Sequence, residues 1–162
     1  MRDVRLWLSK SDLRFIEAEA TRMAPKESGG VLLGYWANFP NEAVVTNVVG
    51  PGPLALHERF RFTPDYEFHY HEIDRLYSTS LRTIQYLGDW HSHPGGTERL
   101  SDLDKVTLAR IACYKDARAP QPVMLVVSPG PSWSPTAHQG SVKRRILRGC
   151  QLSLRQMEVT LF

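Results

Sequence analysis

The sequence GDWHSHPGGTERLSDLDKV, residues 88–106, decides the fold of this chain. Its beginning completes a run of strand-forming residues, 83–90, and the apolar spacing after Ser101 is typical of a helix. Between the two, Pro94 ends the strand because it has no N–H to donate, and the glycines after it let the chain turn sharply. The stretch therefore predicts a strand, a tight turn and a helix, with polar residues gathered where strand and helix meet.

Two histidines, His91 and His93, lie at the exit of this predicted strand. Residues i and i+2 of a strand face the same side, so both imidazoles project together while Ser92 projects the opposite way. Packing of the helix start against the strand exit would bring Asp104 towards the pair. Two nitrogens and one carboxylate oxygen form a three-ligand zinc site, and a fourth position left for water or substrate is typical of catalytic zinc.

The same residue types also have simpler structural interpretations. Ser101 and Asp104 match S-x-x-D, a helix capping box, and taken alone this spacing favours a cap. His69 and His71 repeat the i, i+2 spacing, but they lie in a predicted helix, residues 64–76, where about 200° separates the two side chains. We therefore expect that second pair to be ordinary surface histidines.

The other segments alternate between strands and helices. Strands are predicted at residues 4–8, 29–36, 43–49, 59–63, 123–128 and 150–162, and further helices at residues 9–23 and 101–115. The apolar positions expected to face the core are Leu13, Phe15, Ile16, Ala20 and Met23 in the first helix and Leu103, Val106, Leu108, Ile111 and Ala112 in the last. Residues 128–140, rich in Ser, Pro and Gly, predict an exposed loop. The pattern indicates an α/β domain with the 29–36 and 43–49 strands forming a hairpin.

Composition narrows the class of protein. The chain has 162 residues, of which 42% are hydrophobic and 23% charged, as expected for one globular domain over residues 1–162. No apolar run approaches the ~20 residues of a membrane helix, and the N-terminus lacks the apolar centre of a signal peptide. Cys113 and Cys150 form no CxxC pair and are expected to be buried side chains with free thiols. Such cysteines are typical of a reducing compartment, so we expect the protein in the cytoplasm. We expect no membrane as a partner.

The charge of the chain is mildly basic. The net charge is +3, and the one dense basic run comprises Lys143, Arg144, Arg145 and Arg148. No aromatic residues alternate with it and no nucleic-acid-binding motif surrounds it, so it is interpreted as a solvated face and nucleic acid is not an expected partner.

Taken together, the motifs resemble those of one enzyme family. The segment His91-Ser92-His93-Pro94, with Ser101 and Asp104 after it, matches H-x-H-P-x6-S-x-x-D, the pattern of the JAMM (MPN-type) zinc metallopeptidases, including the prokaryotic JAB proteins. Residues 27–34, beginning with Glu27, resemble the family's E-x-x-G-x-L-x-G segment. The resemblance extends over about residues 9–128 and implies a single JAMM (MPN) domain, a mixed β-sheet flanked by helices in a cytidine-deaminase-like architecture.

The resemblance also implies roles for these residues. One zinc ion per chain would be held by His91, His93 and Asp104, with Glu27 as the general base that takes a proton from water and hands it to the leaving amine. Ser101 would stabilise the oxyanion and would not be the nucleophile. One hydroxyl cannot be aimed fully at both a helix cap and an oxyanion, so the two roles of Ser101 are expected to be only partly compatible.

The implied activity is hydrolysis of the amide bond after the C-terminus of a ubiquitin-like modifier or a similarly conjugated protein. Small members of the family accompany bacterial conjugation enzymes, including those of antiphage defence. Residues 50–59 and 128–140, with Trp133, are candidates for contacting the modifier, and the basic run could hold an acidic partner. Two alternatives stay open: a non-catalytic MPN scaffold, and a peptidase that trims a sulfur-carrier protein or a phage or cell-wall peptide.

Overall fold

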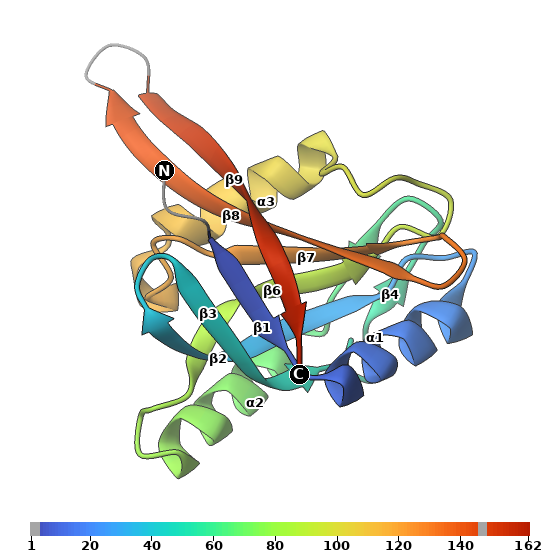
Figure 1. Cartoon of the computed structure of the whole chain (residues 1–162), viewed down its shortest axis with the longest axis horizontal. Coiled ribbons are helices and arrows are strands. Elements are labelled where there is room, and N and C mark those ends of the chain that lie inside the picture. The colour runs from blue at the N-terminus through green and yellow to red at the C-terminus, as the bar shows by residue number, and fades with distance from the viewer. Residues whose placement is uncertain (1–3, 146–148) are drawn as a thin grey trace.

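The computed structural model describes residues 4–145 and 149–162. Helices are interspersed among the strands of a mixed sheet, which confirms the α/β class (Figure 1). The elements are β1 (Arg5–Leu8), α1 (Lys10–Met23), β2 (Gly29–Asn38), β3 (Glu42–Val49), β4 (Leu56–His57), β5 (Phe62–Thr63), α2 (Tyr66–Thr79), β6 (Gln85–Ser92), α3 (Asp102–Cys113), the short 3-10 helix η1 (Lys115–Ala117), β7 (Val123–Ser128), β8 (Ser134–Arg145) and β9 (Gly149–Leu161).

The main sheet is mixed, as predicted, and it also closes on itself. Its strand order is β1-β3-β2-β6-β7-β8-β9, and β9 returns to pair in parallel with β1. A salt bridge of 2.9 Å between Arg5 and Glu158 lies at this seam. No local sequence pattern predicts this closure, because it depends on how far the long β8–β9 hairpin reaches back across the molecule (Figure 1).

The prediction of an exposed loop over residues 128–140 is wrong for most of that segment. Residues from Ser134 onward form β8, which pairs antiparallel with all of β7. Ala137 and Gln139 are buried, and the Gln139 side chain donates a hydrogen bond of 2.7 Å to the Pro40 carbonyl. Trp133 packs against the core and donates to the Thr21 hydroxyl at 2.8 Å. Composition alone missed this strand because its stability comes from the neighbouring β7.

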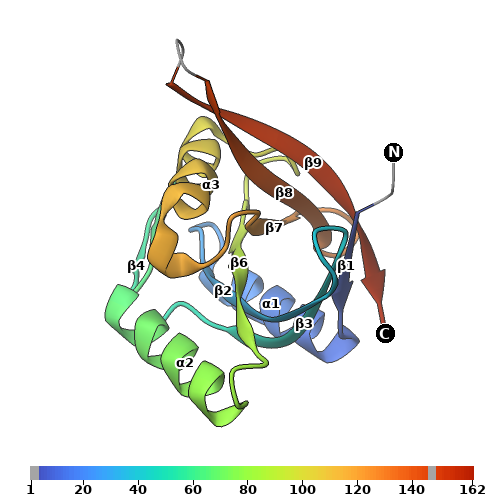
Figure 2. The ribbon, with the colours of Figure 1, turned by 90° about the vertical axis from the view of Figure 1, so that its left-hand side faces the viewer.

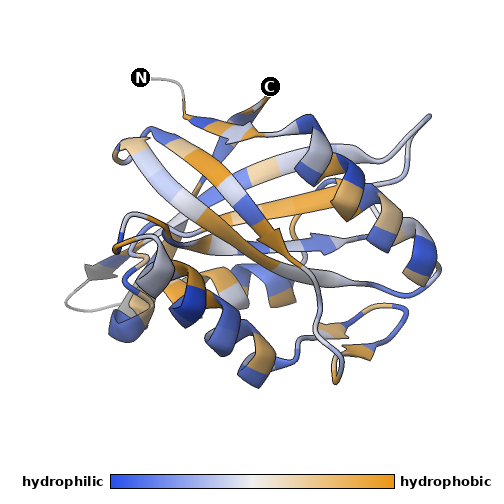
Figure 3. Cartoon of the chain, turned by 90° about the horizontal axis from the view of Figure 1, so that it is seen from below, coloured by the Kyte–Doolittle hydropathy of each residue, from blue (hydrophilic) through white to orange (hydrophobic). Residues whose placement is uncertain are grey.

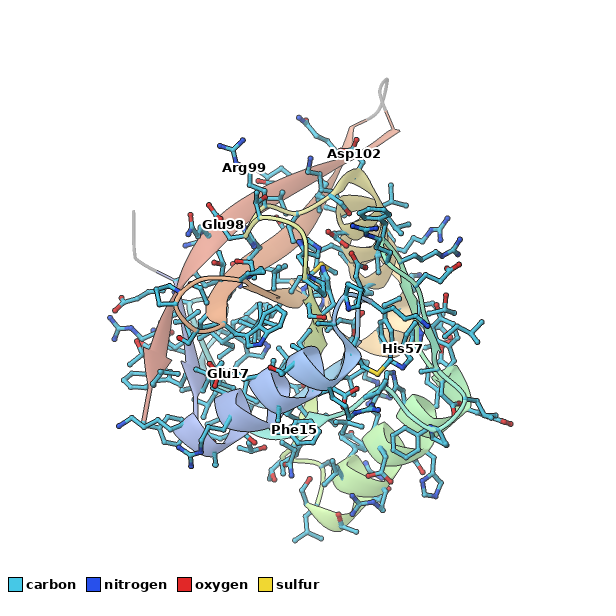
Figure 4. All side chains as sticks on the ribbon, turned by 90° about the vertical axis from the view of Figure 1, so that its right-hand side faces the viewer. Phe15, Glu17, His57, Glu98, Arg99 and Asp102 are labelled. Atoms are coloured by element: carbon cyan, nitrogen blue, oxygen red, sulfur yellow. The ribbon has the colours of Figure 1, made fainter. Side chains whose placement is uncertain are left out.

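The largest core cluster packs the sheet against α1, and smaller clusters lie between the sheet and helices α2 and α3. Helix α1 begins at its N-cap Ser9 and buries Leu13, Ile16 and Ala20, as predicted. Phe15, predicted to face the core, is 46% exposed on the outer part of α1 (Figure 4). Hydrophobic colouring concentrates on the strands, while the helices carry alternating hydrophilic and hydrophobic patches (Figure 3).

Helix α3 is less buried than its sequence predicts. Leu108 alone of the predicted apolar set is fully buried, packed with Leu100, Met124 and Val126. Leu103 and Val106 are 49% and 47% exposed. The helix therefore covers the sheet along a narrow line and leaves an apolar flank uncovered.

Three other predictions are corrected or limited by the structure. Cys113 is exposed rather than buried, and the side chain of Cys150 lies outside the described residues. His69 is buried, not on the surface, and its Nε2 is hydrogen-bonded to the Gly50 carbonyl at 2.8 Å, whereas His71 is exposed, as predicted. Lys143 is exposed on β8; the side chains of the other three basic-run residues lie outside the described residues. None of the helices in the described ranges combines the length and apolar character needed to cross a bilayer.

Strand β6 occupies the position that matters for function. It lies between β2 and β7 in the sheet, and helices α2 and α3 flank it on one face (Figure 2). Helix α1 packs with the core cluster on the opposite face. The end of β6 therefore opens towards the start of α3, as the sequence predicts.

Candidate active site

The last residues of β6 carry the two histidines. His91 pairs with Gly29 of β2 and Val126 of β7, and the backbone N–H of His93 donates to the Val127 carbonyl at 2.9 Å. Both histidines are buried, with 8% of each residue exposed. Ser92 points to the other face, where its Oγ accepts the backbone N–H of Ser28 at 3.0 Å. The predicted alternation of side chains is therefore confirmed.

The structure brings Asp104 to these histidines. Their Nε2 atoms lie 2.9 Å apart; Asp104 Oδ1 is 3.3 Å from His91 Nε2, and Oδ2 is 3.4 Å from His93 Nε2. Donor atoms around a tetrahedral zinc ion, each about 2.0–2.1 Å from the metal, are about 3.3 Å from one another. The three side chains thus present nitrogen and oxygen donors at the spacing a metal ion requires.

A second interaction orients the His93 ring. Its Nδ1 faces the backbone carbonyl of Thr97 at 2.9 Å and donates to it, because a carbonyl can only accept. With its hydrogen on Nδ1, the neutral imidazole has its lone pair on Nε2, where a metal ion would bind. Such a hydrogen bond to the second nitrogen is typical of histidines that ligate metals.

Ser101 caps helix α3 and at the same time places Asp104. The Ser101 Oγ accepts the backbone N–H of Asp104 at 3.2 Å, and the backbone N–H of Ser101 donates to Asp104 Oδ2 at 2.6 Å. The capping box is therefore present. Because the hydroxyl acts as an acceptor in the cap, its hydrogen can still be donated to another group. The cap therefore leaves the hydroxyl hydrogen of Ser101 available, while the oxyanion role of Ser101 stays a prediction.

The ionisable side chains in this cluster shift one another's pKa values. Burial alone would raise the pKa of Asp104, but its bonds to His91 and His93 outweigh burial and hold the pKa far below the usual range. Burial alone would lower the pKa of His93, yet the adjacent Asp104 carboxylate raises it. In the metal-free protein Asp104 is therefore a carboxylate, and protons compete with any metal for His93.

Glu27 lies two residues before the start of β2 and lines the same cavity as His91 and Asp104. Burial raises the pKa of its carboxyl group, while the two histidines work in the opposite direction. Its backbone is held on both sides: the N–H donates to the Glu58 carbonyl at 2.8 Å, and the carbonyl accepts from His57 Nδ1 at 2.9 Å. The β4–β5 hairpin, where Figure 4 labels His57, therefore fixes the position of Glu27.

Sequence reasoning missed this contact between His57 and Glu27, because the two residues are far apart along the chain. Gly29, directly after Ser28, is the feature of the sequence that could have indicated a close contact at this point. A Cβ on Gly29 would lie 2.6 Å from the Trp90 carbonyl oxygen and 2.8 Å from the Phe62 ring. Only glycine lets β5 pack so closely over the beginning of β2.

A cavity of about 630 Å³ extends from these residues between α2 and α3 (Figure 2 shows both helices beside β6). Its floor is formed by β2, β6 and β7. Aromatic rings line much of its wall, namely those of Phe62, Tyr66, Tyr70, Tyr86 and Tyr114. The site therefore has an adjoining, largely apolar space that can hold part of a substrate.

A β-bulge in β6 shapes the floor of this cavity. Leu32 pairs with Gly88 and Leu33 with Tyr86, so one extra residue is accommodated in β6. Gly88 has a φ of +150°, and a Cβ there would lie 1.8 Å from the Val123 carbonyl oxygen. The bulge turns Tyr86 and Asp89 to the same face.

Asp89 and Tyr86 form a pair on this floor. The Tyr86 hydroxyl donates a hydrogen bond of 2.6 Å to Asp89 Oδ1. Burial raises the pKa of Asp89, although the Tyr86 bond works in the opposite direction, and burial raises the pKa of Tyr86 well above its usual value. No motif of the sequence pointed to this pair.

Comparison of the sequence with known proteins identifies a matching family and two named relatives. The model of prokaryotic homologs of the JAB domain matches residues 9–142. A protein of Sinorhizobium fredii named probable metalloprotease y4qB is 38% identical over 144 residues, covering 88% of this chain and 87% of that protein. A protein of Enterobacter hormaechei named CD-NTase/cGAS isopeptidase is 25% identical over 127 residues, covering 78% of this chain and 69% of that protein.

The fold also resembles that of a solved structure. The solution structure of protein DSY2949 from Desulfitobacterium hafniense aligns with a TM-score of 0.70 at 20% identity, covering 97% of this chain and 92% of that one. At this identity the likeness concerns the fold alone.

Proposed function

The chain belongs to the prokaryotic homologs of the JAB domain, a family with relatives named as a metalloprotease and an isopeptidase, and on that premise we propose a specific activity. The protein is a zinc-dependent peptidase of the JAMM type that hydrolyses an amide bond at the C-terminus of a ubiquitin-like or similarly conjugated protein. The observation that carries the proposal is the cluster of His91, His93 and Asp104, of which His91 and Asp104 line one cavity together with Glu27.

The donor set supports zinc as the metal. Two imidazole nitrogens and one carboxylate leave a coordination position for a reactant, which is the arrangement of catalytic zinc sites. When bound, zinc supplies Lewis acidity, which makes water more acidic and polarises a carbonyl group. The Thr97 carbonyl and the Ser101 backbone N–H hold the ligands His93 and Asp104 in the orientation this requires.

Two side chains next to the ligands carry the remaining roles. Glu27 takes the proton from the attacking water and delivers it to the leaving amine; its partial burial favours the protonated form that the second step needs. Ser101 donates its hydroxyl hydrogen to the oxygen that becomes negative in the tetrahedral intermediate. Its Oγ stays anchored by the Asp104 N–H meanwhile.

The proposed substrate is a protein whose extended tail enters the cavity. The β4–β5 hairpin beside Glu27 exposes Leu56 and Phe60, with 63% and 78% exposure, and offers an apolar surface for the body of the modifier. The name of the isopeptidase relative supports an amide formed by protein conjugation, in an antiphage system of the kind that name suggests. We further propose that residues 1–162 act as one domain of cytidine-deaminase-like architecture.

The proposal is tested by measuring zinc per chain in the wild-type protein and in Asp104→Ala after dialysis against metal-free buffer. We expect about one zinc ion per wild-type chain and its loss from the variant. Zinc-loaded protein should then cleave fusions in which a ubiquitin-like protein carries a C-terminal extension, and a chelator should stop the cleavage. Absence of zinc from reconstituted wild-type protein would favour a scaffold without catalytic activity.

A further inference from the structure

One carboxylate in the cavity has no part in the proposed hydrolysis. Asp89 lies in β6 between Val31 of β2 and Met124 of β7. These two neighbours are buried apolar residues that line the same cavity as Asp89. Within the described residues, the hydrogen bond from Tyr86 is the one that reaches its side chain, and no lysine or arginine forms a salt bridge with it. The basic groups that act on Asp89 are the histidines His69 and His91, not a lysine or arginine. A carboxylate among apolar groups is unfavourable without a permanently charged partner of opposite sign.

The surroundings of Asp89 suit a cation. Tyr66, Tyr70 and Tyr114 stand at the rim of the cavity with 59%, 61% and 54% exposure, and aromatic faces attract positive groups. Arg110 lines the cavity too, but it is exposed to solvent. A long basic side chain would place its apolar stem against the rings and its charge at Asp89.

The position of Asp89 relates this pocket to the reaction. It precedes His91 by two residues on one strand, which separates their backbones by about 7 Å. A side chain from a residue near the scissile bond can span that distance. On the carbonyl side of an isopeptide bond the substrate is an extended backbone with successive side chains, whereas the other side is a lysine stem.

We propose that Asp89 is a specificity residue that binds a lysine or arginine side chain on the carbonyl side of the scissile amide. The Tyr86 hydroxyl positions the carboxylate by its hydrogen bond to Oδ1, which leaves Oδ2 to meet the incoming cation. The assignment of this side chain to a substrate rests on the proposed peptidase function. The preference of Asp89 for a cation over a neutral group of the same shape does not depend on the peptidase function.

Binding is measured first, by NMR titration of the zinc-loaded protein with Nα-acetyl-arginine methylamide and its neutral counterpart Nα-acetyl-citrulline methylamide. We expect the arginine probe to shift the backbone amide signals of Val31, Asp89 and Ile111 and to bind roughly 10-fold to 100-fold more tightly than the citrulline probe. Asp89→Asn should abolish this difference. The matched variant Asp116→Asn, which removes an exposed acid from the same cavity, should keep it.

Equal binding of the two probes to the wild-type protein overturns the inference, and this comparison needs no variant to fold. So does a preference that survives in Asp89→Asn. Loss of the preference in Asp116→Asn as well would assign the effect to general charge and likewise contradict a role specific to Asp89.

Cleavage is measured second, with peptides that carry arginine or citrulline at each of the four positions before the scissile bond. We expect one position to favour arginine by roughly 10-fold or more, in the wild type and not in Asp89→Asn. Equal cleavage of all peptides contradicts the inference and leaves the peptidase function intact. Absence of any zinc-dependent cleavage contradicts the proposed function, while the probe titration still decides whether Asp89 binds a cation.

Discussion

His57 donates a hydrogen bond from Nδ1 to the backbone carbonyl of Glu27 at 2.9 Å, which ties the β4–β5 hairpin to the residue proposed as the general base. On the other side, the Glu27 N–H is bonded to the Glu58 carbonyl at 2.8 Å. A proton acceptor must stay within hydrogen-bonding reach of the water it activates. His57 is therefore a positioning residue that acts through Glu27.

The first prediction concerns His57. His57→Ala should lower kcat by about 10-fold, with zinc content and KM little changed, because the Glu27 backbone loses one of its two anchors. His57→Gln offers an amide N–H to the same carbonyl and should recover part of the rate. A fully active His57→Ala enzyme would show that the hairpin does not position Glu27.

The second prediction concerns Glu27 itself. Glu27→Gln keeps the size of the side chain and removes its ability to accept and release a proton, so turnover should fall by about 100-fold to 10,000-fold. The zinc content should stay at the wild-type value, because Glu27 is outside the three-ligand set. Elemental analysis and a cleavage assay on the same samples separate the two effects, and wild-type turnover in Glu27→Gln would refute the mechanism.

The third prediction separates the two roles of Ser101. Ser101→Asp retains a helix-capping acceptor but no hydrogen to donate, so it should fold normally and lose about 100-fold to 1000-fold in rate. Ser101→Thr keeps both functions and is the matched control. Ser101→Ala should lose the rate and also about 1 kcal/mol of stability, measured by urea unfolding. Equal rates for the Asp and Thr variants would leave Ser101 as a cap only.

The fourth prediction concerns the pH dependence of zinc binding. The Asp104 carboxylate raises the pKa of His93 above its usual value of 6.5, and a protonated imidazole cannot ligate a metal. Zinc affinity should therefore be lost as the pH falls through this raised pKa, so the loss begins at a higher pH than for an isolated histidine. Chelator competition between about pH 6 and 8 measures it. An affinity independent of pH over that range would contradict the role of His93.

The fifth prediction concerns the bulge in β6. Gly88→Ala places a Cβ 1.8 Å from the Val123 carbonyl oxygen at a φ of +150°. The backbone strain alone should cost about 1–3 kcal/mol, and displacement of β7 adds to it. Thermal unfolding should show a fall of about 2–4 °C per kcal/mol. Gly95→Ala, with no atom within 4 Å of the new Cβ, is the control and should leave the Tm nearly unchanged.

Much of the site could be predicted because its parts are local. The i, i+2 spacing of His91 and His93 needs only a strand, and the alternation is confirmed by the opposite orientation of Ser92. The capping box of Ser101 and Asp104 is complete within four consecutive residues. Ligand geometry and helix capping both follow from backbone periodicity, which short stretches of sequence encode directly.

The errors arose where a segment depends on distant partners. The strand over residues 134–145 exists because β7 and β9 pair with it, whereas its own composition resembles a loop. Phe15 and Val106 follow helical periodicity but face outward, because the sheet covers only part of each helix. His69 is buried and bonded to the Gly50 carbonyl, 19 residues earlier in the chain, and no local pattern predicts that contact.

The sequence by itself determined the donor atoms, their spacing at a strand exit and a helix start, and the order of most elements, because these depend on neighbours a few residues apart. The tertiary structure alone decided that Glu27 meets His91, through the pairing of Gly29 with His91 across β2 and β6. It also decided the closure of the barrel, the anchoring of Glu27 by His57 and the place of Asp89 in the cavity. Strand register and loop packing join residues remote in the chain, so no local pattern specifies them.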